Sequence, residues 1–231
     1  MILIIRGHIR KSFTNTDLLN FIKEIYNIEP DLKIYIHTWS IFSNNISWRT
    51  LEIDDTCVTK EIFYDYFGEL KHLIQEIIID DDSNIQLIGN LQGKINEELW
   101  HSNDGLTPLI GWKNYWYGKY RIIKYIYDDI NINPDEIIVN FRFDIIINNS
   151  DRVNLFLDLI KNNKKSKFTK NKFLFDYEQL GIDNIYIGNI NTMYSLIHKF
   201  HHELDDILIK NKDTIHQELF VYRENEKIFT N

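Results

Sequence analysis

The stretch Ile137-Ile138-Val139-Asn140-Phe141-Arg142-Phe143-Asp144 decides how this chain folds. An apolar run ends in an arginine and an aspartate two residues apart, as expected when a buried central strand carries two charges to its tip. Arg142 and Asp144 share strand parity, so both side chains point to the same side. Buried charges are costly unless they are paired or ligated. The pair therefore either closes the strand as an ion pair or holds a diphosphate and its metal in a crevice.

The composition of the 231 residues indicates a folded protein with a sizeable core. Hydrophobic residues make up 44% and aromatic residues 14%, which excludes a disordered chain. The net charge of −8 argues against broad binding of nucleic acid, although it leaves room for a local basic site for a phosphorylated ligand. The chain contains no alanine and much isoleucine, asparagine and lysine, which indicates an AT-rich source such as a large virus or a low-GC bacterium.

Nothing in the sequence indicates export or a membrane. The apolar start, Ile2 to Ile5, is too short for a signal peptide, and no apolar stretch is long enough to span a bilayer. The single cysteine, Cys57, cannot form an internal disulfide, so no oxidising compartment is implied. We expect a cytoplasmic protein without a transmembrane segment, located in the host cytoplasm if the chain is viral.

Strand-like and helix-like segments alternate along the chain. Strands are predicted at residues 1–5, 32–36, 85–88, 136–141, 172–175 and 184–187. Helices are predicted at 16–26, 59–79 (in pieces), 107–130, 151–161, 191–210 and 215–222. This alternation predicts the α/β class, with a mostly parallel sheet flanked by helices. No Pro/Gly-rich linker interrupts the chain, so we expect residues 1–231 to form a single domain.

The ends of the predicted strands provide the candidate site residues. In open α/β sheets the ligand binds beyond the carboxyl ends of the strands. Three of the predicted strands end in residues that could contact such a ligand. They are Arg6, Gly7, His8 and Arg10 after the first strand, His37, Thr38 and Trp39 after the second, and Arg142 and Asp144 after the central one. If the ligand is a nucleotide, as the family resemblance described next implies, Gly7 would let the backbone approach it closely. Arg10 would then pair with phosphate or else lie at the surface beside a turn, and Trp39 would line a nucleoside pocket or belong to the core.

Four short elements in order resemble one family. They are the G-x-x-R-x-x-F pattern in 6–13, Ile-His-Thr-Trp at 36–39, the R-x-D pattern at 142–144, and Asp-Asn-Ile-Tyr-Ile-Gly at 183–188. Together they resemble a family of polysaccharide-building glycosyltransferases found in bacteria and large DNA viruses.

This resemblance implies a Rossmann-like GT-A fold, a nucleotide-diphosphate sugar donor and a glycan acceptor. It also implies a D-x-D motif that holds a divalent metal, but Arg142 stands where the first aspartate would be. Asp144 is then the metal ligand that can be carried over, with Mn²⁺ or Mg²⁺ as the cation suited to oxygen ligands. Arg142 could instead neutralise the diphosphate itself. His216 is a further candidate metal ligand, because some GT-A enzymes place a histidine near the C-terminus.

The resemblance leaves the catalytic base and the acceptor side to be argued from the residues. Asp183, an acid ahead of a short strand, is the first candidate base, with Asp176 and Glu218 as alternatives. The aromatic stretch 112–117 includes Tyr117, which would stack on a sugar or base or else pack in the core.

Three functions follow from these features. The leading one is transfer of a sugar from a nucleotide-diphosphate sugar to a glycan acceptor. A sugar-phosphate nucleotidyltransferase is an alternative, although residues 6–13 contain one glycine where such enzymes carry a glycine-rich loop. The other alternative is a non-catalytic nucleotide- or glycan-binding module, which Arg142 in place of an aspartate favours.

Overall fold

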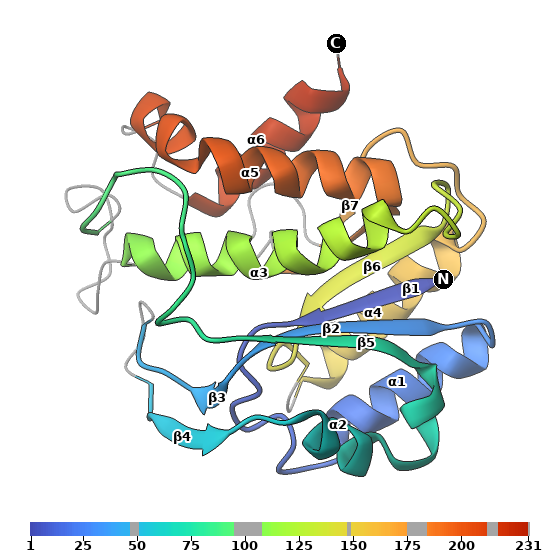
Figure 1. The fold of residues 1–231 in the computed structure, drawn as a ribbon. Helices are drawn as coiled ribbons and strands as arrows, with labels where there is room; N and C mark the ends of the chain where they lie inside the picture. The colour runs from blue at the N-terminus through green and yellow to red at the C-terminus, as the bar shows by residue number, and fades with distance from the viewer. Residues whose placement is uncertain (47–50, 95–107, 147–148, 175–183, 212–216, 231) are drawn as a thin grey trace.

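A computed structural model describes residues 1–46, 51–94, 108–146, 149–174, 184–211 and 217–230. Its centre is a six-stranded sheet with the order β5-β2-β1-β6-β8-β7 (Figure 1). The strands are β1 (Ile2–Arg6), β2 (Lys33–Trp39), β5 (Ile74–Asp80), β6 (Ile137–Arg142), β7 (Lys172–Phe173) and β8 (Tyr186–Asn189). Strands β5, β2, β1 and β6 run parallel, and β8 is antiparallel to both of its neighbours. The prediction of a mostly parallel sheet flanked by helices is confirmed.

Helices cover both faces of this sheet. They are α1 (Asp17–Ile28), α2 (Lys60–Phe67), α3 (Leu109–Asp128), α4 (Ser150–Asn163), α5 (Ile190–Lys210) and α6 (Gln217–Phe229). Helices α3, α5 and α6 lie on one face, and α1, α2 and α4 lie on the other (Figure 1).

Alternation along β1 explains why both faces are apolar. Ile2 and Ile4 belong to the core shared with α3 and α5, whereas Leu3 and Ile5 belong to the core shared with α1 and α4. All four side chains are fully buried. Successive strand residues point to opposite faces, so a continuous apolar run is what a strand covered on both sides requires.

Two predicted elements were wrong. Helical pieces were expected up to residue 79, but α2 ends at Phe67. The next residue, Gly68, has a φ of 54°, which suits a helix terminus. A short 3₁₀ turn (Gly68–Leu73) and the edge strand β5 follow. The strand expected at 85–88 is absent from this described segment. Short apolar runs such as Ile77 to Ile79 fit a helix or a strand equally well, and pairing with β2 decides the outcome.

A two-stranded antiparallel ribbon, which the sequence did not predict, lies beyond the carboxyl end of β2. Its strands are β3 (Ile41–Ser43) and β4 (Asp54–Cys57). The carbonyl of Phe42 in β3 accepts a hydrogen bond of 2.9 Å from the backbone N–H of Arg10. The ribbon thus anchors the loop that follows β1. Among the described helices, none has the length and apolar character needed to cross a membrane.

Candidate functional site

The register of the parallel strands gathers three polar side chains in one row. Arg6, the last residue of β1, pairs with His37 of β2 on one side and with Arg142 of β6 on the other. Arg6 shares its strand parity with Ile2 and Ile4, which pack against α3. The face of the sheet toward α3 is therefore apolar over most of its length and polar at its carboxyl end.

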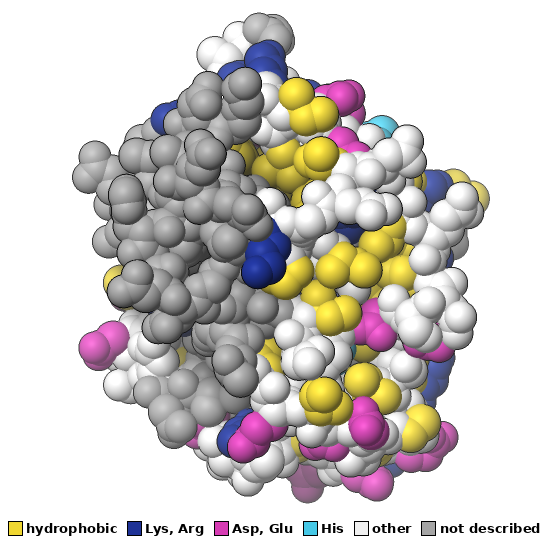
Figure 2. Space-filling view, turned by 90° about the vertical axis from the view of Figure 1, so that its left-hand side faces the viewer, with side chains coloured by type: hydrophobic (Ala, Val, Ile, Leu, Met, Phe, Trp, Pro, Cys, Tyr) yellow, Lys and Arg dark blue, Asp and Glu magenta, His cyan; other side chains and the backbone are white. Residues whose placement is uncertain are grey.

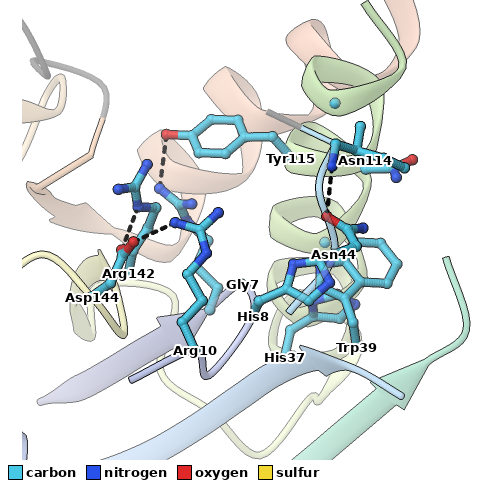
Figure 3. A pocket seen from close by; sticks show the side chains of 14 residues that line it. Gly7, His8, Arg10, His37, Trp39, Asn44, Asn114, Tyr115, Arg142 and Asp144 are labelled. Atoms are coloured by element: carbon cyan, nitrogen blue, oxygen red, sulfur yellow. Dashed lines mark hydrogen bonds and ion pairs between the residues drawn. The ribbon is translucent and has the colours of Figure 1, made fainter. Parts of the chain in front are cut away.

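A cleft opens at this polar end, between the strand ends and α3 (Figure 3). It holds about 610 Å³ of empty space, part of it open to solvent. Guanidinium groups lie at one end, and rings and amides lie at the other (Figure 3). The residues that line it are Arg6, Gly7, His8, Arg10, His37, Trp39, Asn44, Ile46, Gly111, Asn114, Tyr115, Gly118, Arg142 and Asp144.

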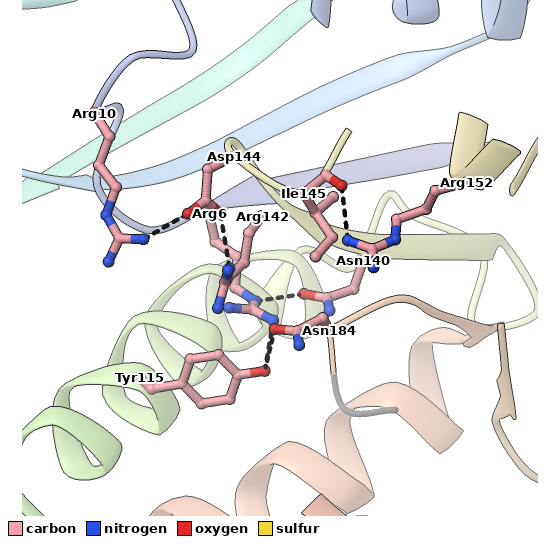
Figure 4. Close-up of polar contacts among 9 residues, drawn as sticks. All are labelled: Arg6, Arg10, Tyr115, Asn140, Arg142, Asp144, Ile145, Arg152 and Asn184. Carbon is pink, nitrogen blue, oxygen red and sulfur yellow. Dashed lines mark hydrogen bonds and ion pairs between the residues drawn. The ribbon is translucent and has the colours of Figure 1, made fainter. Parts of the chain in front are cut away.

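Arg6 forms the floor of the guanidinium end. Its side chain is buried, and its Nε donates to Asn140 Oδ1 over 3.1 Å. Its Nη2 donates to the hydroxyl oxygen of Tyr115 over 2.8 Å, and its guanidinium carbon lies 4.2 Å from the centre of that ring. The Tyr115 hydroxyl also lies 3.5 Å from Asn184 Oδ1 (Figure 4). These contacts fix one cation against the wall formed by α3.

Asp144 links the two other arginines of the cleft. Its Oδ1 accepts from Arg142 Nε over 2.9 Å, and its Oδ2 accepts from Arg10 Nη1 (Figure 4). Burial alone would raise the pKa of the Asp144 carboxyl, but the charges of Arg142 and Arg10 and their hydrogen bonds lower it to about 2. Asp144 is therefore ionised at neutral pH, and the ion pair proposed from its strand parity with Arg142 is present.

The loop after β1 aims Arg10 at Asp144. Gly7 has a φ of 96°, and its N–H donates to the carbonyl of His37. Arg10 has a φ of 51°, the one described non-glycine residue in the left-handed region. Such a backbone costs about 1–3 kcal/mol and persists where its surroundings fix it. The bonds to His37 and Phe42 are those fixing contacts.

Rings make up the other end of the cleft. Trp39 lies between His8, at a centroid distance of 5.9 Å, and Tyr117, which stacks on it at 6.0 Å and 24°. His37 meets the edge of Trp39 at 5.0 Å. Burial lowers the pKa of His37, and burial together with Arg10 lowers that of His8 to about 3. Both imidazoles are therefore neutral at pH 7.

Asp80 holds His37 in place from behind. Its Oδ2 lies 3.2 Å from His37 Nε2 and accepts from Arg121 Nε over 3.0 Å. Burial alone would raise the pKa of Asp80, but these two partners outweigh it and lower the pKa to about 2. Asp80 ends β5 and is half-buried against β2, because the segment before it is a strand rather than the helix expected there.

Three buried polar atoms at the ring end of the cleft lack a hydrogen-bond partner among the described residues. They are His8 Nε2, His37 Nδ1 and Asn114 Oδ1. Buried polar atoms are nearly always paired, so each such atom needs an explanation. All three belong to the end of the cleft that holds the rings. A ligand with its own donors and acceptors would satisfy them.

The structure brings most of the predicted site residues together. Those that line the cleft are Arg6, Gly7, His8, Arg10, Trp39, Arg142 and Asp144. Thr38 instead donates its hydroxyl to the carbonyl of Gly7, and Tyr117 packs behind Trp39. Asp176, Asp183 and His216 lie outside the described residues, and Glu218 lies in α6.

Sequence reasoning gave only part of the cleft wall that α3 and the loop after β3 contribute. Asn44 lines the cleft although no motif includes it, and Asn114 and Tyr115 belong to the aromatic stretch 112–117 but were not singled out there. The aromatic stretch 112–117 was the sequence feature that pointed to this wall of the cleft. Some of its residues line the cleft and others pack in the core. Trp116 is fully buried in the core, whereas its neighbour Tyr115 reaches Arg6.

The residues around Asp144 do not fit a divalent cation in this arrangement. Asp144 is the sole carboxylate among the cleft-lining residues that the structure describes, and both of its oxygens accept from arginines. No group of three or more His, Cys, Asp or Glu in the described part of the chain is arranged to hold a metal. Because His216 lies outside the described residues, metal binding by Asp144 together with His216 stays a prediction.

Comparison of the sequence with protein-family models and with curated proteins finds no match. Among solved structures, the chain matches one described as a crystal structural analysis of an active-site mutant of LgtC. The two chains are 11% identical, the match covers 99% of this chain and 70% of that chain, and the TM-score is 0.42. A match this distant assigns no activity and no residue role, so the function has to be argued from the cleft.

Proposed function

We propose that the chain is a glycosyltransferase of polysaccharide biosynthesis, which moves a sugar from a nucleotide-diphosphate sugar to a glycan acceptor. One observation carries this proposal: a single cleft has guanidinium groups at one end, and at the other end it has rings and buried polar atoms that make no hydrogen bond within the described residues. Guanidinium groups recognise phosphate oxygens through paired, charge-assisted hydrogen bonds. Aromatic rings and amides suit a nucleoside base. A nucleoside diphosphate carries both features at its opposite ends.

The charge of the cleft supports an anionic ligand. Arg6, Arg10 and Arg142 bring three positive charges and Asp144 brings one negative charge, which leaves a formal excess of two positive charges. The whole chain has a formal net charge of −8. A local field of opposite sign to the protein as a whole favours entry of a negatively charged ligand at that point.

The proposed reaction is a substitution at the anomeric carbon of the donor sugar. The bond between that carbon and the phosphate oxygen breaks, and its electron pair leaves with the nucleoside diphosphate. The acceptor hydroxyl oxygen forms the new bond and gives up its proton to a base. Arg10 and Arg142 would stabilise the charge that develops on the leaving diphosphate.

Asp183 is the base in this proposal. Asn184, the next residue in the chain, contacts Tyr115 of the cleft wall. The GT-A form of the fold and a glycan acceptor are inferred from the sequence resemblance, and the mostly parallel sheet agrees with the first of these two inferences.

Thermal shift with a panel of nucleoside diphosphates tests the donor half of this proposal. A ligand that binds the native state raises the unfolding temperature by mass action. We expect one nucleoside diphosphate to stabilise the chain more than the others and more than its own nucleoside. If none of them shifts the transition, the cleft is not a nucleotide site and the proposal fails.

A non-catalytic binding module is the second candidate, because Arg142 occupies the position of an acidic residue in the motif that the chain resembles. Hydrolysis of the matching nucleotide-sugar separates the two candidates. An enzyme releases nucleoside diphosphate slowly to water even without an acceptor, whereas a module binds the donor and returns it intact.

A further inference from the structure

Arg142 of the cleft stands where the D-x-D motif that the chain resembles has its first aspartate. Arg142 ends β6, in register with Arg6 at the end of the neighbouring strand β1. Arg10 reaches the same place from the loop after β1, and Asp144 joins it to Arg142. The three cations thus come from two adjacent strand ends and one loop.

Asp144 is already engaged as a partner of arginines. One oxygen accepts from Arg142 and the other from Arg10. A cation bound there would have to displace charge-assisted hydrogen bonds, which are the stronger kind. It would also lie close to positively charged guanidinium groups, and like charges at short range repel each other. Both effects oppose a divalent metal at this carboxylate.

The backbone of Arg10 is an independent sign that the site is built around its side chain. Arg10 adopts a left-handed conformation with a φ of 51°, and its N–H is fixed to Phe42 of β3. Sparsely populated backbone conformations cluster at ligand-binding sites, where the surrounding structure holds them. Here this conformation directs a guanidinium group across the cleft to a residue 134 positions further along the chain.

We propose that the cleft binds the diphosphate of its ligand without a divalent metal, with the guanidinium groups of Arg10 and Arg142 in the metal's place. This inference rests on the proposed function, because it takes the ligand to be a nucleoside diphosphate. Arg6 adds a third positive charge at the floor of the cleft. Arginine suits this role because its planar fork pairs with two phosphate oxygens at once and stays charged at all relevant pH values.

Calorimetric titration of the wild-type chain with uridine, guanosine, adenosine and cytidine diphosphate tests the inference. Each titration is run once with excess EDTA and once with excess Mn²⁺. We expect the best ligand to bind with dissociation constants that agree within about threefold in the two conditions. Binding that appears only with Mn²⁺, or that strengthens more than about tenfold with it, overturns the inference and leaves the proposed function standing. Failure of every nucleotide in both conditions overturns the proposed function itself.

Variants then test whether the arginines supply the affinity seen with EDTA. Arg10→Gln and Arg142→Gln should each weaken binding by about 10- to 150-fold, the effect of one charge-assisted hydrogen bond. Lys124→Gln is the matched control, because it removes one positive charge from an exposed ion pair with Asp128 on α3. The control should bind as the wild type does. Wild-type affinity in both arginine variants overturns the inference.

Conservative variants guard against a loss that comes from misfolding. Arg10→Lys and Arg142→Lys keep the charge but lose the planar fork, so their affinity should lie between that of the glutamine variants and that of the wild type. Unfolding temperatures recorded for all variants identify any that are not folded. A lysine variant that unfolds like the wild type but binds no better than its glutamine counterpart contradicts the role of charge in this inference.

Discussion

Replacing Asp144 by asparagine removes one negative charge from the centre of the cleft while keeping the size of the side chain. In the folded protein the Asp144 carboxyl has a pKa of about 2, compared with an ordinary value of 3.8. A difference of this size corresponds to about 2 kcal/mol of folding free energy. The side chain is 16% exposed, so solvent weakens this contribution only in part.

The sign of the pH dependence follows from the direction of that shift. The pKa is lower in the folded than in the unfolded chain, so the stabilisation is complete above about pH 4 and is lost as the pH falls toward 2. At neutral pH, Asp144→Asn also leaves Arg10 and Arg142 without their shared counter-charge. Removing one partner of a buried ion pair costs about 3–5 kcal/mol, so we expect a loss of about 2–5 kcal/mol. Typical domains have about 5–15 kcal/mol in total, so most of this range leaves the variant folded.

Urea denaturation of wild type and variant at pH 7 and at about pH 2 measures both quantities. We expect a large difference in the free energy of unfolding at pH 7 and a much smaller one at the acidic pH. Asp128→Asn is the control, because it removes an exposed carboxylate whose surface pair with Lys124 contributes little to stability. Equal stability of Asp144→Asn and wild type at pH 7, or an undiminished difference in acid, would refute this account of the carboxylate.

The location of the site at the carboxyl ends of the strands could be predicted from the sequence, because this rule does not depend on how the strands pair. Carboxyl ends of parallel strands meet at one edge of the sheet. The arginines at the ends of the first and central strands were therefore expected at that edge, and the pairing of β1 with β6 places them side by side. The pairing of Arg142 with Asp144 could also be predicted, because residues two positions apart in a strand face the same side.

Long-range partners could not be predicted in the same way. Tyr115 lies on a helix 109 residues after Arg6, and only the packing of α3 on the sheet brings them together. Arg10 reaches Asp144 because its backbone is left-handed. The local sequence does not predict this conformation, because arginine rarely adopts it. Asp80 was missed because the run before it fits a helix or a strand, and the choice depends on β2.

Three further changes test separate parts of the site. Gly118→Ala would place a Cβ atom 2.7 Å from the fully buried ring of His37, so we expect a loss of about 1–3 kcal/mol from overpacking, measured by urea denaturation, despite the better helix propensity of alanine. Arg10→Ala should weaken nucleoside diphosphate binding by about 1.5–3 kcal/mol in a calorimetric titration, and equal affinities would remove Arg10 from the site. Asp183→Asn keeps the size of the side chain but removes its basicity, so an enzyme that inverts the anomeric carbon should lose transfer by about 10²-fold or more. Its donor affinity should change little, because the base acts on the acceptor hydroxyl rather than on the diphosphate. Loss of donor binding would instead make Asp183 a residue that positions the ligand, and unchanged transfer would shift the role to Glu218 or indicate a retaining reaction that needs no such base.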